Sequence, residues 1–182
     1  NSFSKLFNLS NKNKKLKIVK LSRNFGHQNA IFAGLENSSG DCIFIIDADL
    51  QDPPELIPEL IKEYENGAEV VHTVRKKRLG ENRIKMLITK FAYKVINYFS
   101  DINLPIEAGD FKLISKKVLD IIINLKEFDP YIRGLSVWAG FKQSYVKYNR
   151  EQRLLGKTHF SIFSKGPVLE FLRGLTSYST KP

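Results

Sequence analysis

The sequence predicts an α/β fold in which a mainly parallel sheet is flanked by helices. Between residues 17 and 74, three short apolar runs alternate with two segments of helical periodicity, and strands joined by helices pair in parallel through right-handed crossovers. The chain has 182 residues, of which 42% are hydrophobic and 26% charged, an ordinary composition for one domain with a real core. Charged residues directly follow the predicted strands, at the sheet edge where such folds bind ligands.

The first half of the chain supplies the alternating pattern. Short apolar runs predict strands at residues 17–21, 43–46 and 69–74. Apolar residues at helical spacing predict helices at residues 3–10, between the polar loop 22–27 and the turn 37–40, and between residues 52 and 66. In the last of these helices, Asp52 is expected at the N-cap and Pro53 at the first helical position.

The second half is expected to add two strands to the sheet, at residues 110–114 and 141–148. Helices are predicted over residues 82–100, from a cap at Ser115 through Leu125, and from Asp129-Pro130 to Gly140. A basic amphipathic stretch follows at residues 160–175. It fits either a helix packed on the domain or a helix lying on a membrane surface.

A pair of carboxylates closes the strand at residues 43–46, which is expected to be buried on both faces. Asp47 and Asp49 are one residue apart, and Gln51 adds a neutral oxygen nearby. Hard oxygen ligands of this kind suit Mg²⁺ or Mn²⁺. An Asp-x-Asp also arises by chance roughly once in two chains of this length. The strand before it and the helix start after it therefore carry the prediction of a metal site.

The chain carries an excess of positive charge, with 29 Lys and Arg against 19 Asp and Glu, a net charge of +10. Such an excess favours an anionic partner, whether a nucleic acid, an acidic membrane surface or a phosphorylated substrate. The basic run 75–78, followed by Arg83 and Lys85, leaves a strand on the same sheet edge as Asp49. A run of this kind is usually a solvated face, but its position beside the predicted metal site favours a functional role.

Other patterns exclude several classes of site. No apolar run approaches the roughly 18 residues that cross a bilayer, and there is no Walker A sequence, zinc spacing or nucleophile elbow. His27 and His72 lack metal-ligand spacing, and structural or solvent-facing roles are expected for both. The single Cys42 is expected to be a small buried hydrophobe and fits a reducing, cytoplasmic setting.

Six segments, taken together and in order, resemble family 2 glycosyltransferases of the polyprenyl-phosphate type. The most specific is residues 47–55, Asp-Ala-Asp-Leu-Gln-Asp-Pro-Pro-Glu. The others are residues 22–28, residues 74–78 with Gly80-Glu81, residues 108–113, Arg133-Gly134, and Arg150 with Arg153 and Gly156. The resemblance runs over nearly the whole chain, and it implies a GT-A fold and an inverting sugar transfer from a nucleotide sugar.

The resemblance also implies roles for individual residues. Asp47 matches a donor-site carboxylate, and Asp49 and Gln51 match positions that hold the divalent cation. Asp110 matches a carboxylate near the acceptor that is often described as the base. The cationic positions are Arg75 and Lys85, which match groups that receive the acceptor phosphate, and Arg150 and Arg153, which match a mobile loop over the phosphates.

A phosphate acceptor makes a strong base unnecessary in this reaction. The second pKa of a phosphate monoester lies near about 6, so the group is largely dianionic at neutral pH and already nucleophilic. Asp110 is therefore expected to position groups rather than to abstract a proton.

The implied partners are a UDP- or GDP-linked sugar, a polyprenyl (undecaprenyl) phosphate and the cytoplasmic face of the cell membrane, and a homo-oligomer is compatible with the sequence. The expected division is a catalytic domain over residues 1–159 and an amphipathic juxtamembrane segment over residues 160–182. The chain opens without Met, and the resemblance predicts that a first strand and nucleotide-binding loop precede it. The alternatives are a soluble saccharide acceptor and, remotely, a basic nucleic-acid-binding domain; no nucleic-acid partner is expected.

Overall fold

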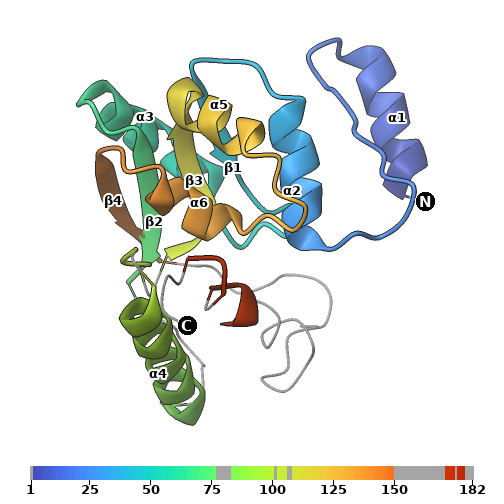
Figure 1. The fold of residues 1–182 in the computed structure, drawn as a ribbon. Helices are drawn as coiled ribbons and strands as arrows, with labels where there is room; N and C mark the ends of the chain where they lie inside the picture. Colours follow the sequence, from blue (N-terminus) through green and yellow to red (C-terminus); the bar gives the residue numbers. More distant parts are fainter. Residues whose placement is uncertain are drawn as a thin grey trace.

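A computed structural model gives the structure of the chain and describes residues 2–76, 83–100, 102–105, 108–149, 171–174 and 176–178. Figure 1 shows the order of the helices and strands along the chain. The helices are α1 (Ser2–Lys12), α2 (His27–Glu36), the 3₁₀ turn η1 (Pro54–Leu56), α3 (Ile57–Glu65), α4 (Arg83–Phe99), α5 (Lys116–Asn124) and α6 (Ile132–Trp138). The strands are β1 (Cys42–Ile45), β2 (Val70–Arg75), β3 (Ala108–Ser115) and β4 (Gln143–Tyr148).

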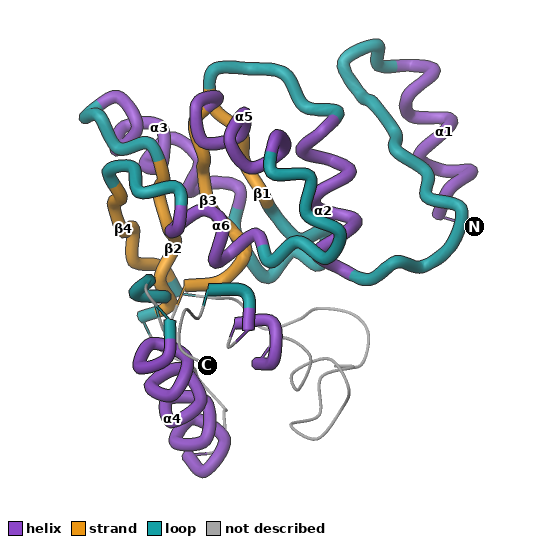
Figure 2. Tube along the Cα trace, in the orientation of Figure 1, coloured by secondary structure: helices purple, strands orange, loops and turns teal. Residues whose placement is uncertain are grey.

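The strands form one sheet in the order β1-β3-β2-β4 among the described residues (Figure 2). β2 and β4 pair in parallel, whereas β3 is antiparallel to both of its neighbours, β1 and β2. β1, β2 and β4 therefore run in one direction and β3 runs against them. The predicted α/β fold is confirmed, and the insertion of β3 between β1 and β2 makes the sheet mixed. The carboxyl ends of three strands and the beginning of β3 consequently lie at one edge.

Helices cover both faces of this sheet. Helix α3 packs on one face and α2, α5 and α6 pack on the other, as Figure 1 shows. Side chains alternate between the faces along a strand. In β3, Phe111 and Leu113 join the core under α3, while Ile114 joins the core under α5. By the same alternation, Asp110 and Lys112 lie on the face that α6 covers.

Two predicted helix starts have different outcomes. Ser115 caps α5 as predicted, because its Oγ accepts a hydrogen bond from the Val118 backbone N at 3.3 Å. The prediction that Asp52 caps the following helix was wrong. Asp52 is buried and accepts a hydrogen bond from the Tyr148 hydroxyl, and η1 begins after Pro53 without a side-chain cap.

The prediction of a strand at residues 17–21 was also wrong. These residues have no ladder partner and form no regular element, and Val19 is exposed. β1 is the edge strand of the described sheet, and its backbone pairing is with β3. An apolar run without a neighbouring strand has no partner for its backbone groups, so it stays extended and partly solvated. The strand at 43–46 is likewise only partly buried, contrary to the expectation of burial on both faces.

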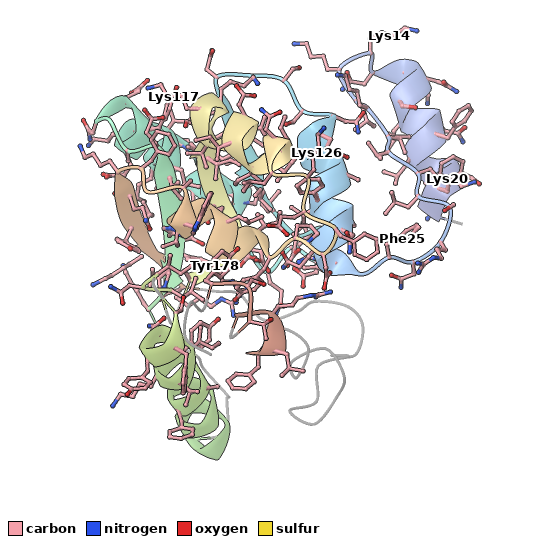
Figure 3. All side chains as sticks on the ribbon, viewed as in Figure 1. Lys14, Lys20, Phe25, Lys117, Lys126 and Tyr178 are labelled. Atoms are coloured by element: carbon pink, nitrogen blue, oxygen red, sulfur yellow. The ribbon has the colours of Figure 1, made fainter. Side chains whose placement is uncertain are left out.

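A third apolar cluster attaches α4 to the rest of the molecule. Ile96 of α4 packs with Leu104, Tyr131 and Val137, and the partly buried Tyr178 packs against the same cluster. The Tyr178 ring lies directly on Gly134 of α6, so that a Cβ at position 134 would overlap it. The Tyr178 hydroxyl donates to the Tyr131 carbonyl at 3.2 Å. Figure 3 shows Tyr178 close to the body of the domain.

Several predictions lie outside the described residues. They concern Arg150, Arg153, residues 77 and 78 of the basic run 75–78 and most of the amphipathic stretch 160–175. Lys85 lies in α4, but its side chain is outside the description. Within the part of the chain that is described, no helix combines the length and apolar character needed to cross a membrane.

Candidate active site

Two carboxylates from different strands converge on His27 at this edge of the sheet. Asp47 follows β1, Asp110 lies near the beginning of β3, and His27 is the first residue of α2. His27 Nε2 lies 3.5 Å from Asp110 Oδ2 and 3.8 Å from Asp47 Oδ1. The His27 side chain is 45% exposed, whereas that of Asp110 is 15% exposed. Solvent therefore reaches the His27 imidazole more readily than it reaches the Asp110 carboxylate.

Arg133 of α6 holds Asp110 from the protein side. Its Nη2 lies 3.0 Å from Asp110 Oδ2, and its Nη1 donates to the Tyr93 hydroxyl at 2.7 Å. Tyr93 belongs to α4, so one guanidinium connects three elements: β3, α6 and α4. A planar guanidinium with donors in fixed directions is suited to this kind of link. The orientation of Asp110 thus depends on both helices.

The surroundings keep Asp110 ionised. Burial alone would raise the pKa of this carboxyl, but Arg133, the hydrogen bond with His27 and the buried Lys112 outweigh burial and hold the pKa well below its usual range. A carboxylate with such a low pKa is a weak base. Its chemical capacity here is to accept hydrogen bonds and to orient cations.

The pKa of Asp47 is shifted in the opposite direction, above its usual value. Burial raises its pKa, His27 lowers it, and the carboxylates of Asp110, Asp49 and Asp52 raise it again. The loop after β1 therefore concentrates negative charge. Gathered carboxylates of this kind are stabilised by a cation.

The oxygen atoms of Asp49 and Gln51, in the loop after β1, are of the kind that binds a divalent cation. Asp49 Oδ1 accepts a hydrogen bond from the Gln51 backbone N at 3.2 Å, which fixes a tight turn around Leu50 at φ 59°. In the described ranges, no cluster of three or more His, Cys, Asp or Glu residues is arranged to hold a metal. Mg²⁺ typically takes only one or two protein carboxylates and completes its shell with water and substrate phosphate. Asp49 could supply one such carboxylate, and the role of Gln51 as a neutral oxygen ligand stays a prediction.

Arg75 is the last residue of β2, and its side chain lies beside Gly109, the neighbour of Asp110 in the chain. Its Nη2 lies 3.1 Å from the position that a Cβ on Gly109 would occupy, so the absence of a side chain at 109 makes room for the guanidinium. Arg75 is also hydrogen-bonded to Tyr148, whose hydroxyl donates to Asp52. The predicted phosphate-binding cation is therefore anchored at the sheet edge that carries Asp110.

The structure brings together some predicted site residues and adds others. Asp47, Asp110 and Arg75 lie at one edge with Asp49 and Gln51 in the adjoining loop, whereas Lys85, Arg150 and Arg153 are not placed. The sequence predicted no catalytic or binding role for His27, Arg133, Tyr93 or Lys112, although His27, Arg133 and Lys112 lie in segments that carry the resemblance. The contact of Arg133 with Asp110 spans 23 residues, and no spacing rule signals it. Lys112 could have been found, because it is two residues from Asp110 and so shares its face.

Comparisons with known proteins find relatives over most of the chain. The chain is 46% identical over 168 residues to the "Uncharacterized glycosyltransferase YkcC" of Bacillus subtilis, which covers 92% of this chain and 51% of the relative. It is 37% identical over 164 residues to the "Prophage bactoprenol glucosyl transferase homolog" of Escherichia coli, covering 90% of this chain and 53% of the relative. The "Bactoprenol glucosyl transferase" of Shigella phage SfV matches to the same extent.

The chain spans about half the length of these curated relatives. Residues 3–122, which run from α1 into α5 and include the carboxylates at the sheet edge, match the family described as Glycosyl transferase family 2. That match covers more than half of the chain. The chain therefore belongs to glycosyl transferase family 2, a family of enzymes in which dependence on a divalent metal is general.

Proposed function

We propose that this chain carries the catalytic site of an enzyme that transfers a sugar, with inversion, from a nucleotide sugar to a polyprenyl phosphate. The observation that carries the proposal is the convergence of Asp47 and Asp110 on His27, beside Arg75, at the carboxyl edge of the sheet. The names of the bactoprenol glucosyl transferase relatives support the choice of acceptor. In the reaction, an acceptor phosphate oxygen bonds to the anomeric carbon while the bond from that carbon to the diphosphate oxygen breaks.

Asp49 and Gln51 are the residues that would hold Mg²⁺ or Mn²⁺, and Asp47 would contact the donor. When bound there, the cation neutralises the negative charge that grows on the leaving diphosphate. The turn at Leu50 holds the Asp49 carboxylate in place through the Gln51 backbone N, so this ligand is preorganised.

Arg75 is proposed to receive the acceptor phosphate, as a guanidinium can bind a phosphate through two parallel hydrogen bonds. Lys85, Arg150 and Arg153 are proposed to contribute further positive charge around the phosphates. Since the acceptor is already largely dianionic and Asp110 is a weak base, Asp110 serves to orient the reacting groups. Proximity and alignment then supply the catalytic effect.

The proposed setting is the cytoplasmic face of the cell membrane, with residues 1–159 forming the catalytic domain and residues 160–182 forming a juxtamembrane segment that stays attached to the domain through Tyr178. The net charge of +10 supports this placement, because anionic lipid attracts basic segments. The acceptor is itself a membrane lipid, so an enzyme of this kind must work at a bilayer.

The donor site can be tested by thermal-shift titration of the chain with Mn²⁺ plus UDP and with Mn²⁺ plus GDP. We expect a stabilising shift that requires both the metal and one of the nucleotides, and that Asp49→Ala abolishes. Asp120→Ala is the matched control, since Asp120 is a partly exposed residue of α5 that pairs with Lys116. A shift retained in Asp49→Ala would contradict the assignment of the metal site.

The acceptor can be tested separately with the full-length protein. Incubation with nucleotide sugars and either undecaprenyl phosphate or soluble oligosaccharides should give a glycosylated lipid phosphate and no glycosylated saccharide. Transfer to the saccharide alone would support the other acceptor class and overturn the proposed one.

A further inference from the structure

Helix α4 is connected to the candidate site by directional hydrogen bonds. Arg133 Nη1 donates to the Tyr93 hydroxyl of α4 at 2.7 Å, while Nη2 of the same guanidinium lies 3.0 Å from Asp110 Oδ2. The side chains of Arg133 and Asp110 are only 17% and 15% exposed, so little water competes for these donors. Because the guanidinium is planar and its donors point in fixed directions, the two contacts hold one rigid group at both ends.

The polar contacts continue from Asp110 towards the proposed donor side of the site. Asp110 Oδ2 lies 3.5 Å from His27 Nε2, and the same nitrogen lies 3.8 Å from Asp47 Oδ1. A chain of neighbouring polar groups therefore runs from Tyr93 on α4, through Arg133, to the carboxylate that is proposed to contact the donor.

The hydrogen bond at Tyr93 lies on the face of α4 that packs on the domain. Tyr93, Ile96 and Asn97 are three and four positions apart, which places them on one side of the helix. Ile96 is buried in the apolar cluster that includes Leu104 and Tyr131, and Asn97 exchanges two hydrogen bonds with the backbone of Leu104, at 3.0 and 3.3 Å. Figure 1 shows α4 projecting away from the sheet. The position of α4 thus depends on a short patch of contacts, in which Tyr93 supplies the contact to Arg133.

Helix α4 also carries Lys85, which is proposed to add positive charge around the phosphates. Lys85 precedes Tyr93 by about two helical turns, a distance over which a helix moves as one rigid element. A shift of α4 at Tyr93 would therefore displace Lys85 and, through Arg133, loosen the hold on Asp110. The position of α4 and the orientation of Asp110 are thus connected by one guanidinium.

We propose that Tyr93 is a positioning residue: its hydroxyl keeps the Arg133 guanidinium turned onto Asp110, so that the site is aligned only when α4 is packed on the domain. This inference deepens the proposed function and rests on it for the identity of the reacting groups. The coupling runs through Arg133, and Tyr93 itself contacts no substrate. Loss of the Tyr93 hydroxyl should therefore slow the reaction without weakening the binding of the nucleotide sugar.

The first experiment uses NMR to measure how firmly Arg133 is held, without any sugar nucleotide. The chain is labelled with ¹⁵N at arginine, and the Arg133 signals are identified by their loss in Arg133→Lys. A guanidinium that is held at both ends rotates slowly about its Nε–Cζ bond, so Nη1 and Nη2 should give two separate signals in the wild type. In Tyr93→Phe, which removes only the hydroxyl, rotation should be faster and the two signals should broaden or merge.

Tyr64→Phe is the matched control for the loss of a tyrosine hydroxyl. The Tyr64 hydroxyl donates to the Asp41 carbonyl oxygen at 3.4 Å, and Tyr64 belongs to α3, on the opposite face of the sheet from α6. This variant should leave the rotation of Arg133 unchanged. Unchanged rotation in Tyr93→Phe as well would overturn the inference, and merged Arg133 signals in the wild type would overturn it without any variant.

The second experiment measures kcat and KM for the full-length protein with undecaprenyl phosphate as acceptor. Tyr93→Phe should lower kcat about tenfold, as expected for a lost hydrogen bond to a charged group, while KM for the nucleotide sugar stays within about twofold of the wild type. Arg133→Lys should lower kcat at least as far. In the double variant, Tyr93→Phe should cause no further loss, because the effects of residues that act through one another are not additive.

The kinetic outcomes separate this inference from the proposed function. Losses that multiply in the double variant would mean that Tyr93 acts independently of Arg133, which contradicts the inference. A full-length protein that transfers no sugar to the lipid phosphate, but in which Arg133 rotates more slowly in the wild type than in Tyr93→Phe, would contradict the proposed function alone.

Discussion

His72 shows how a single buried residue can make stability depend on pH. It is fully buried in β2, its Nε2 lies 2.9 Å from Gln143 Oε1, and its ring stacks on Tyr145. Burial is the main cause, followed by Lys112, of the lowering of its pKa to about 3. In the unfolded chain the pKa returns to about 6.5. Between pH 6.5 and pH 3, His72 therefore binds a proton in the unfolded state but not in the folded state.

The unfolding free energy should therefore fall as the pH is lowered from about 6.5 towards 3, with His72 contributing up to about 1.4 kcal/mol per pH unit. Urea denaturation at pH 7.5, 6, 5 and 4 can measure the change. His72→Gln cannot take up this proton, so its stability should fall less steeply over the same range. Parallel curves for the two proteins would show that His72 does not carry the effect.

The approach of Arg75 to Gly109 gives a second prediction for a single residue. With Nη2 only 3.1 Å from the Cβ position, Gly109→Ala must displace the guanidinium by a few tenths of an ångström. We expect a several-fold higher KM for the lipid-phosphate acceptor with little loss of stability, because the displaced atoms end a flexible side chain. Gly34→Ala is the control: Gly34 is in helix α2 with no atom near its Cβ position, and steady-state kinetics should be unchanged.

Individual site residues differ in how far the sequence could predict them. Asp47 and Asp49 were predicted at the ligand-binding edge because they directly follow an apolar run, which is a local feature, whereas only the resemblance placed Asp110 near the acceptor. His27 was expected to be structural or solvent-facing, but it lies between the two carboxylates. Its place follows from the packing of α2 beside the sheet, and no pattern within residues 22–28 encodes that contact.

At the scale of one element, the cap of α5 can be tested directly. Ser115→Ala removes the oxygen that accepts from the Val118 backbone N, and loss of a serine cap typically costs about 1 kcal/mol. Chemical denaturation should show that decrease in the unfolding free energy. Ser10→Ala should change the stability by less than about 0.5 kcal/mol, because the Ser10 hydroxyl only donates to a carbonyl within α1. Equal effects of the two substitutions would contradict the capping role.

Helices were predicted more faithfully than strand pairing. The stripe of apolar residues that marked residues 82–100 corresponds to α4, since helical periodicity is a local signal. The antiparallel insertion of β3 between β1 and β2 could not be predicted, because pairing joins residues such as Phe44 and Leu113 that lie far apart in sequence. The same limit explains the failure at residues 17–21, where an apolar run has no strand beside it.

The molecule as a whole is organised by two apolar cores on opposite faces of one sheet. Leu60 of α3 and Ile122 of α5 are both fully buried, one in each core. Leu60→Ala and Ile122→Ala should each lower the unfolding free energy by about 2–5 kcal/mol. Far-UV and near-UV circular dichroism should still report one coincident transition, because the strands of the shared sheet contribute to both cores. Two separated transitions would mean that the faces unfold independently.

The close packing of Tyr178 on Gly134 restricts which residues homologous proteins can have at these two positions. A methyl group at position 134 would collide with the ring, so neither position can drift freely while the other is kept. Homologues with a larger residue at position 134 should have a smaller residue at position 178. The two positions should therefore covary, although they lie 44 positions apart in the sequence. A library randomised at both positions and selected for folding should recover such compensated pairs and few unmatched ones.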